Sequence, residues 1–352
     1  MRLSRRRFNA LAGAALAVPA LSRAARAQQR VFVDSAGRKV SLPAHVARVF
    51  AAGPPATILL FALAPDTLLG WSRTFHPAER EFVPEKYANL PELGRLTGRG
   101  NTANVEVILA AKPDVIFDYG TISPTYVSLA DRVQEQTGVP YVLIDGAFGA
   151  MESAMIRMGE LLAKPETAVE LAAYVRSTLA TIDEVLAKRP SGQRPRVYYA
   201  RGPKGIDTAL GGSITVESIE RVGAINVAAE ALGRGGTATV SLEQVLTWNP
   251  DTIVTLDENF YRTAHEDPSW RGVAAIRQNR VYLAPRLPFG WVDFPPSINR
   301  LIGLRWLARV LYPDLYAGNL VSETRDFYRR FYHRTPDDAQ IARLLGPGLS
   351  RG

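Results

Sequence analysis

The chain has 352 residues, of which 47% are hydrophobic and 22% are charged, a composition typical of a globular protein and long enough for two domains. Its net charge of +8 does not indicate a nucleic-acid partner, because residues 1–27 carry six arginines and no acid. Outside this segment the 42 basic residues fall to 36, against 34 acidic ones. Cysteine is absent, which excludes disulfides, thiolate catalysis, thiolate metal sites and a lipoprotein anchor.

The first 27 residues are typical of a secretion signal. Residues 4–8 (SRRRF) resemble the twin-arginine export motif, a short apolar run covers 11–21, and residues 25–27 (ARA) form a small-x-small cleavage site. The alternative, a membrane anchor, requires about 20 apolar residues, and this run is shorter. We therefore expect cleavage after Ala27 and a mature protein in the periplasm of a two-membrane bacterium, by the Tat or the Sec route.

The first half of the mature chain alternates strands with helices. A hairpin is predicted at its start, with strands 31–33 and 40–42 around the turn DSAGR. The predicted elements that follow are strand 49–52, a helix ending at 63, strand 68–72, helix 105–111, strand 115–118, helix 126–136 and strand 141–144. This alternation is typical of an α/β fold with a mainly parallel sheet.

A long helix is predicted over residues 165–188. Proline suits its first turn, apolar residues recur every three to four positions, and the sequence RPSG ends it. At about 1.5 Å per residue, it spans roughly 36 Å. A helix of this length between two similar halves is expected to join them rigidly.

The second half repeats the plan of the first. Its predicted elements are strand 196–200, helix 215–222, helix 242–248, strand 252–256, strand 281–284, helix 298–311 and an aromatic helical tail from 322. The predicted division of the chain is a signal peptide (1–27), an N-terminal lobe (28–150), a helical linker (151–192), a C-terminal lobe (193–312) and a C-terminal helical tail (313–352).

One segment occurs twice, at a constant offset of 137 residues. NVEVILAAKPDVIF at 104–117 and SLEQVLTWNPDTIV at 241–254 share five identical positions of fourteen, whereas average composition gives about one by chance. A second echo relates RVFAAGP at 48–54 to RVYYARGP at 196–203, with one residue inserted. Two similar lobes imply a cleft between them, and such clefts are common ligand sites.

The pattern Glu-x-(Ile/Val)-Leu-x-x-x-Pro-Asp in each lobe, together with the long joining helix and the secretion signal, resembles the substrate-binding proteins of ATP-binding-cassette (ABC) importers of the helical-backbone class. These proteins carry iron chelates, haem or cobalamin. The resemblance covers nearly all of the mature chain. It implies two similar lobes with mainly parallel sheets joined by one long helix, a ligand cleft between them, no intrinsic cofactor, and a monomer that docks on permease subunits in the inner membrane.

The resemblance also implies that Glu106 and Glu243, one on each lobe, meet arginines of the permease. Each glutamate lies in the first turn of a predicted helix. The alternative is that each simply complements the helix dipole, which is worth about 0.3–1 kcal/mol. The occurrence of both at the same place in the two lobes favours docking.

Candidate ligand-binding residues follow from the rule that ligands meet the carboxyl ends of strands in open α/β sheets. The residues selected in this way are Arg73, His76, Tyr119, Arg201, Lys204, Phe289 and Trp291. Arg201 is the leading candidate, because a guanidinium binds a carboxylate, catecholate or oxyanion by charge-assisted hydrogen bonds; the alternative is a surface or inter-lobe salt bridge. Phe289 and Trp291 form either an apolar wall for an organic chelate or part of the core.

Other patterns carry less information. The glycine-rich runs at 94–100 and 233–236 do not end in Gly-Lys-Ser/Thr, so we interpret them as turns and not as phosphate loops. The four histidines include no pair at i, i+4 spacing, so no bare-metal site is predicted, although His76 alone is a candidate metal or oxyanion contact. No motif predicts catalytic residues.

Three functional hypotheses result. The first is a periplasmic receptor for an iron(III) chelate of the siderophore type. The second keeps the scaffold and replaces the ligand by molybdate or tungstate, for which Arg201, Lys204 and His76 are suited; haem and cobalamin are further chelate alternatives. The third is a secreted enzyme on the same two-lobed fold, since a fold does not determine a function.

Overall fold

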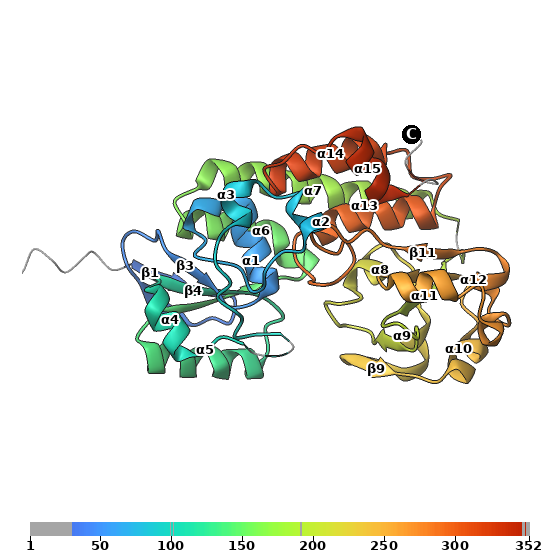
Figure 1. Ribbon diagram of the computed structural model, residues 1–352, viewed down its shortest axis with the longest axis horizontal. Helices are drawn as coiled ribbons and strands as arrows, with labels where there is room; N and C mark the ends of the chain where they lie inside the picture. Colours follow the sequence, from blue (N-terminus) through green and yellow to red (C-terminus); the bar gives the residue numbers. More distant parts are fainter. Residues whose placement is uncertain (1–29, 99, 101, 191, 347–348, 350–352) are drawn as a thin grey trace, which may run out of the picture.

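The computed structural model describes residues 30–98, 100, 102–190, 192–346 and 349, so the predicted signal peptide and its cleavage site lie outside the described residues. The protein has two α/β lobes side by side, and a layer of helices runs across both of them (Figure 1). The predicted fold class is therefore confirmed. No helix in the described ranges has the length and apolar character that a membrane span requires.

The N-terminal lobe is built on a three-stranded parallel sheet in the order β3-β4-β5. Five of the six residues of β4 are buried, as expected for a central parallel strand covered on both faces. The elements of this half are β1 (Arg30–Val33), β2 (Lys39–Leu42), β3 (Val49–Ala51), α1 (Pro54–Leu63), η1 (Pro65–Thr67), α2 (Pro77–Arg80), α3 (Glu85–Ala88), α4 (Val105–Ala111), β4 (Val115–Gly120), α5 (Pro124–Thr137), β5 (Tyr141–Asp145) and α6 (Phe148–Leu161).

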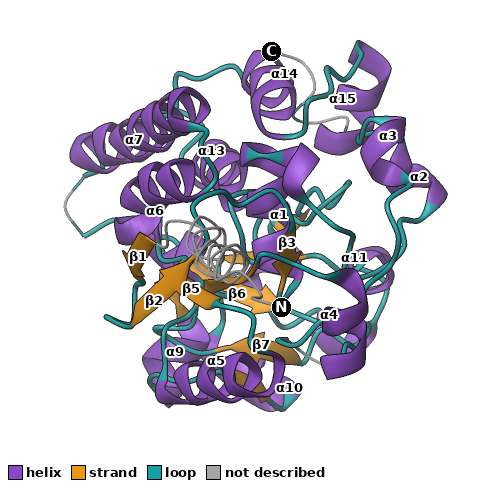
Figure 2. Cartoon of the chain, turned by 90° about the vertical axis from the view of Figure 1, so that its left-hand side faces the viewer, coloured by secondary structure: helices purple, strands orange, loops and turns teal. Residues whose placement is uncertain are grey.

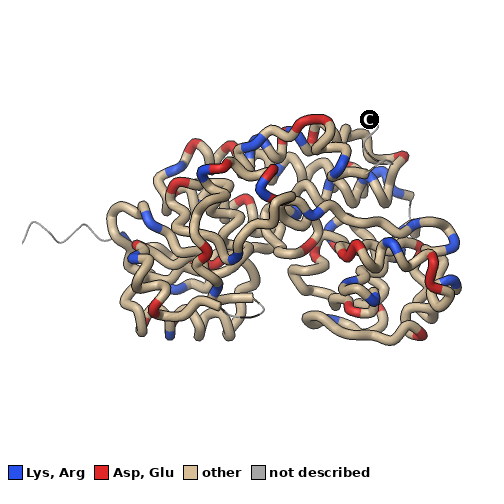
Figure 3. The backbone as a smooth tube through the Cα atoms, viewed as in Figure 1, with Lys and Arg blue, Asp and Glu red and all other residues tan. Residues whose placement is uncertain are grey.

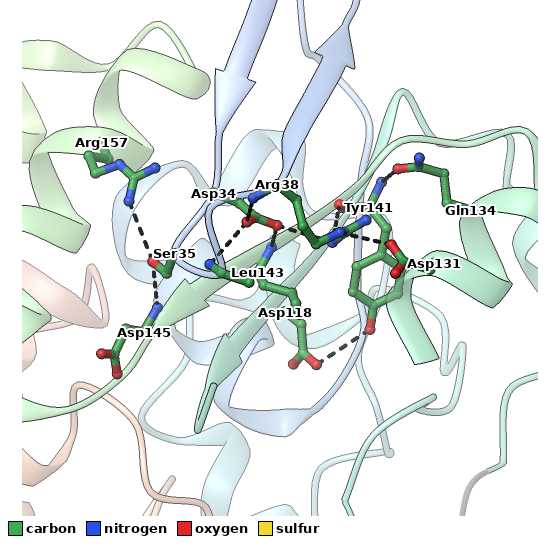
Figure 4. Close-up of polar contacts among 11 residues, drawn as sticks. Asp34, Ser35, Arg38, Asp118, Asp131, Gln134, Tyr141, Leu143, Asp145 and Arg157 are labelled. Atoms are coloured by element: carbon green, nitrogen blue, oxygen red, sulfur yellow. Dashed lines mark hydrogen bonds and ion pairs between the residues drawn. The ribbon is translucent and has the colours of Figure 1, made fainter. Parts of the chain in front are cut away.

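The turn of the β1-β2 hairpin covers the free edge of β5. The backbone amide of Ser35 donates to the carbonyl of Leu143 at 2.8 Å, and the Asp34 carboxylate accepts from the amide of Leu143 at 3.3 Å. The Ser35 hydroxyl accepts from the amide of Asp145 at 3.0 Å (Figure 4). Pairing of these edge groups closes the sheet against association with another strand.

The C-terminal lobe has a four-stranded parallel sheet in the order β11-β10-β6-β8 and an antiparallel pair, β7 and β9. Figure 3 shows both signs of charge spread over both lobes. The elements of this half are β6 (Arg196–Ala200), β7 (Asp207–Ala209), α8 (Glu217–Arg221), β8 (Ile225–Asn226), α9 (Val227–Leu232), β9 (Thr237–Thr239), α10 (Leu242–Trp248), β10 (Thr252–Thr255), α11 (Glu258–Thr263), η2 (Pro268–Trp270), α12 (Ala274–Arg277) and β11 (Val281–Leu283).

The long helix is present with the predicted bounds, as α7 (Pro165–Lys188), but it does not join the lobes alone. It packs against α6 and against α13 (Arg300–Leu311), which also contacts α8 of the C-terminal lobe. The layer is completed by α14 (Leu320–Phe331) and α15 (Asp338–Leu345) (Figures 1 and 2). The apolar stripe of α7 is thus covered by a packed layer. The lobe boundaries at residues 150 and 193 stay predictions.

The repeated segment forms a clamp between a helix and the neighbouring strand in the N-terminal lobe. The Asp114 carboxylate, at the start of β4, accepts from the amides of Ala47 and Arg48, both at 2.8 Å. The Arg48 side chain donates in return to the carbonyls of Ala111 and Lys112, at 2.5 and 3.0 Å, which the end of α4 leaves without helical partners.

The C-terminal lobe contains the same clamp. The Asp251 carboxylate accepts from the amide of Arg196 at 3.1 Å, and the Arg196 side chain donates to the carbonyl of Trp248 at 3.2 Å. In both lobes the helix ends on a residue in the left-handed conformation, Lys112 (φ 47°) and Asn249 (φ 44°). The two sequence similarities therefore have one structural cause. In each lobe one repeated segment supplies the aspartate and the helix end, and the other supplies the arginine.

One predicted strand is wrong. Residues 68–72 form only isolated bridges, Leu68 with Val49 and Trp71 with Glu92. The segment changes partner at Gly70, where an added Cβ would lie 2.4 Å from the carbonyl oxygen of Pro91. The other predicted elements are present within a few residues of their expected bounds. The elements that were not predicted include α2, α3, β7, β8, α9, β9, α11 and α12.

The C-terminal helices complete the core of the N-terminal lobe. The Tyr332 ring lies 6.4 Å from Phe61 of α1 and 5.4 Å from Phe289, centre to centre. His333 Nε2 lies 2.9 Å from the carbonyl oxygen of Phe61. Tyr328 packs edge-on to Phe82 at 5.6 Å. This aromatic cluster makes the tail an integral part of the first lobe.

The Tyr332 hydroxyl is buried with no hydrogen-bond partner among the described residues. Replacement Tyr332→Phe removes an unpaired polar group, so we expect the free energy of unfolding to stay level or rise by up to about 1 kcal/mol. Tyr332→Ala should lower it by about 3–5 kcal/mol through loss of buried aromatic contacts. Urea unfolding followed by fluorescence measures both. A loss above 1 kcal/mol in Tyr332→Phe would mean that the hydroxyl has a partner.

Candidate functional site

A cavity of about 730 Å³ lies between the lobes. The N-terminal lobe lines it with the start of α1, the end of β4 and with Arg95, Thr97 and Gly98. The C-terminal lobe lines it with the residues that follow β6 and with parts of 286–296. The cavity therefore lies at the carboxyl ends of parallel strands, as expected for an α/β ligand site. It is the candidate functional site.

Five of the seven predicted ligand residues line this cavity: Arg73, His76, Tyr119, Arg201 and Phe289. Two do not. Lys204 is exposed on the loop after β6, away from the cavity lining.

Trp291 is fully buried and does not form a wall of the cavity, in contrast to the prediction. Its indole N–H donates to the Tyr328 hydroxyl at 3.2 Å. The reason is the close approach of α13, where a Cβ on Gly303 would lie 1.9 Å from the carbonyl oxygen of Trp291. This contact holds the Trp291 backbone against the helical layer, so the side chain belongs to the core.

Arg201 already has an acidic partner. Its guanidinium lies 3.1 Å from the Asp293 carboxylate, which also accepts from the Tyr199 hydroxyl at 3.2 Å. Burial raises the pKa of Asp293, while Arg201 opposes the rise. The guanidinium also lies 4.6 Å from the ring centre of Phe294, a cation–π distance. Arg201 therefore does form a salt bridge, but the pair is largely buried within the C-terminal lobe and is not the surface or inter-lobe pair of the predicted alternative. Any ligand contact of Arg201 is additional to it.

Arg73 is paired in the same way. Its guanidinium donates two hydrogen bonds to Glu79, at 2.6 and 2.8 Å, in a bidentate arrangement. The Glu79 carboxylate also accepts from the backbone amide of His76 at 2.8 Å. Glu79 is buried, whereas His76 is exposed at the rim. This arrangement positions Arg73 and His76 together, although the expected strand before them is absent.

Asp118 is a buried carboxylate on the cavity that the sequence analysis missed. It accepts from the amide of Tyr119 at 3.0 Å and from the Thr97 hydroxyl at 3.3 Å. It also accepts from the Tyr141 hydroxyl at 3.4 Å (Figure 4). Burial raises the pKa of Asp118 to about 6 against these hydrogen bonds. The available signal was an acid inside the otherwise apolar strand VIFDYG.

A fully buried arginine next to the cavity joins the lobes: Arg300 donates to the carbonyl of Ile214, which lines the cavity, at 3.3 Å. The side chain of Arg300 donates to Glu217 of the C-terminal lobe at 2.6 Å and to the carbonyl of Gly146 in the N-terminal lobe at 2.5 Å. Its guanidinium lies 4.4 Å from the ring centre of Phe148, and the Glu217 carboxylate accepts from the amide of Phe148 at 2.9 Å. Burial raises the pKa of Tyr119, which Arg300 partly opposes.

Three further cavity residues were missed. Phe294, which is 58% exposed, directly precedes Pro295 and Pro296, and Arg95 lies in the glycine-rich run interpreted only as a turn. Arg286 follows β11 and lies 3.9 Å from Glu258. Within the described ranges, no three His, Asp or Glu side chains converge as a metal site.

Glu106 and Glu243 occupy equivalent positions, each exposed in the first turn of its helix, α4 or α10. The helices begin on Asn104 and Ser241, whose side chains accept from backbone amides of the first turn. The Ser241 side chain and a backbone amide lower the pKa of Glu243. The two helices lie on different lobes, both below the helical layer in the view of Figure 1.

The family model described as periplasmic binding protein matches residues 79–287, more than half of the chain. The chain belongs to this family. It is therefore a substrate-binding protein of an ABC importer, which delivers a ligand to a membrane permease. Membership also indicates an exported protein, whereas cleavage after Ala27 stays a prediction.

Individual relatives differ in ligand. The molybdate-binding protein MolA of Haemophilus influenzae is 26% identical over 342 residues, covering 88% of this chain and 93% of that protein. Its molybdate-bound structure has a TM-score of 0.72 and 25% identity, and the match covers 88% of this chain and 99% of that chain. The structure of an ABC transporter solute binding protein from Sulfurospirillum deleyianum has a TM-score of 0.82 and 26% identity. The match covers 90% of this chain and 99% of that chain. The haem uptake protein IsdE of Staphylococcus aureus is 22% identical, covering 65% and 78%.

The raised pKa of Asp118 predicts a pH dependence of stability. Its pKa is about 6 in the folded protein and 3.8 for an ordinary aspartate, as in the unfolded chain. Between pH 3.8 and 6 the folded protein therefore binds a proton at Asp118 that the unfolded chain has released. Stability from this group is present below pH 4 and is lost as the pH rises through 6, by about 2–3 kcal/mol. The difference in unfolding free energy between wild type and Asp118→Asn should fall by this amount from pH 4 to pH 7.

Urea titrations at pH 4, 5, 6 and 7 measure this difference, with Glu135→Gln as the control on an exposed acid of α5. A difference that stays constant across the range would contradict the raised pKa.

Proposed function

We propose that the protein captures an anionic ligand in the cavity between its lobes and presents it to the permease. The carrying observation is that arginines of both lobes line one cavity, Arg73 and Arg95 from the first lobe and Arg201 and Arg286 from the second. Guanidinium groups bind carboxylates, catecholates and oxyanions through paired, charge-assisted hydrogen bonds.

A molybdate or tungstate oxyanion is the first candidate ligand. The similarity to MolA, which is named for molybdate binding, extends over 88% of this chain and 93% of that protein. The burial of Trp291 also removes one of the two aromatic residues that favoured an organic ligand on sequence grounds. The order of the two ligand hypotheses is therefore reversed relative to the sequence analysis.

An iron(III) chelate of the siderophore type is the second candidate. A volume of about 730 Å³ is within the range of sites for drug-sized organic molecules. Aromatic side chains also face this space, among them Phe289 and the largely exposed Phe294. Haem and cobalamin belong to the same alternative, and IsdE is named for haem uptake.

The test is native mass spectrometry with elemental analysis on mature protein purified from its own periplasm, followed by titration with molybdate and with sulfate. Molybdenum or tungsten without organic mass, and selective molybdate binding, are expected for the first candidate. Iron with several hundred daltons of organic mass would establish the second. Absence of binding to any anion or chelate would overturn the proposal, and turnover of the ligand would favour the enzymatic hypothesis.

We further propose that Glu106 and Glu243 dock on the permease. The double variant Glu106→Ala/Glu243→Ala should bind ligand within about twofold of wild type, because both side chains are exposed outside the cavity lining. Uptake by the reconstituted importer should fall roughly tenfold, since each exposed charge contributes to recognition of the partner.

The matched control is Glu135→Ala/Glu266→Ala, which removes one exposed acid from each lobe at other positions. Unfolding measurements account for the helix-dipole contribution of Glu106 and Glu243. Equal uptake by both double variants would remove the docking assignment.

A further inference from the structure

The charges that line the cavity are unevenly paired. Four arginines line it, and two of them carry internal carboxylate partners: Arg73 with Glu79 and Arg201 with Asp293. A ligand anion that binds either of these guanidiniums must share it with the carboxylate already present. An added negative charge is therefore best stabilised by the other two arginines, Arg95 and Arg286.

Arg95 is the cavity arginine that has no ion pair among the described residues. Its Nε donates to the carbonyl of Gly100 at 2.9 Å, and its two terminal nitrogens have no hydrogen bond within the described part of the chain. Arg286 differs, since its guanidinium lies 3.9 Å from Glu258 and is about half exposed to solvent. The charge of Arg95 is thus unbalanced inside the cavity region.

Hydrogen bonds to the loop after β3 fix the backbone of the segment that follows Arg95. The amides of Leu96 and Thr97 both donate to the carbonyl of Ala52, at 2.7 and 3.0 Å. The Thr97 hydroxyl donates to the buried Asp118 at 3.3 Å. Gly53 permits this approach, because a Cβ there would lie 2.3 Å from the Thr97 hydroxyl oxygen.

The backbone of Arg95 is anchored on its other side as well. Its carbonyl accepts from the amides of Thr102 and Ala103, at 3.0 and 3.1 Å, and its own amide donates to the Thr102 hydroxyl at 3.2 Å. A cation on a backbone fixed in this way loses little backbone freedom when it binds an anion, which favours affinity.

We propose that Arg95 is the principal anion-binding residue of the cavity, donating from its terminal nitrogens to the oxyanion, carboxylate or catecholate oxygens of the ligand. Arg73 and Arg201, with their carboxylates, then shape the walls and limit the total positive charge. This assignment rests on the proposed function, because it takes an anionic ligand in this cavity as given.

The competing explanation is that Arg95 only stabilises the local backbone through Gly100. Two substitutions separate the explanations. Arg95→Gln and Arg95→Lys both remove the Nε donor to Gly100, but only lysine keeps the positive charge. A structural role predicts equal effects of both, whereas an anion-binding role predicts that lysine retains part of the affinity.

The experiment is calorimetric titration of the mature protein with sodium molybdate and with a ferric tris-catecholate complex, as the two anionic probes. For the probe that wild type binds, Arg95→Gln should raise Kd roughly tenfold to hundredfold, the loss expected for a charge-assisted hydrogen bond. Arg95→Lys should give an intermediate Kd. Arg132→Gln, an exposed arginine of α5 outside the cavity lining, is the matched control and should stay within twofold of wild type.

Two results overturn the assignment and leave the proposed function intact: a Kd for Arg95→Gln within threefold of wild type, or equal losses in Arg95→Gln and Arg95→Lys. The proposed function, and this inference with it, is overturned if the wild type binds neither probe and the protein purified from the periplasm carries no anion. Thermal unfolding of each variant shows that a lost affinity is not a lost fold.

Discussion

The arrangement of the two lobes depends on the buried side chain of Arg300. A buried guanidinium without partners is costly, so its contacts must be kept together in the folded state. These contacts come from both lobes, Glu217 on one side and the carbonyl of Gly146 on the other, with the Phe148 ring against the guanidinium face. The requirement of this one side chain for complete pairing therefore holds the two lobes together next to the cavity.

Above this point, the helical layer restricts how the lobes move. α7 and α13 pack on each other, and α13 also contacts the C-terminal lobe, so wide separation of the lobes would break contacts at both levels. We therefore expect a small rotation on ligand binding, with the rims of the cavity moving most. Such a rotation would bring the lining residues Arg95, Arg73 and His76 of the first lobe closer to Arg286 and Phe294 of the second.

Local patterns made much of the fold predictable, and distant contacts account for what was missed. The repeated helix and strand were recognised because the same residue pattern occurs in both lobes, and not from the contacts of Asp114 and Asp251, which lie 66 and 55 residues from the arginines whose amides they accept from. Phe289 and Trp291 are two residues apart, yet Phe289 lines the cavity and Trp291 lies in the core. The close packing of α13 against the backbone of Trp291 causes this difference. Likewise, no local pattern shows that Asp293 neutralises Arg201.

The packing of the last helices on α1 has a consequence for the order in which the protein folds during synthesis. Eight of the ten residues of α1 are buried, and Phe61 among them is covered by Tyr332 and His333, which are made some 270 residues later. β4, α6 and α7 cover other parts of α1 earlier, so in a nascent chain it is the face around Phe61 that stays uncovered until almost the whole polypeptide has been made. The first lobe matures last, so the chain depends on protection from aggregation until its final helices arrive.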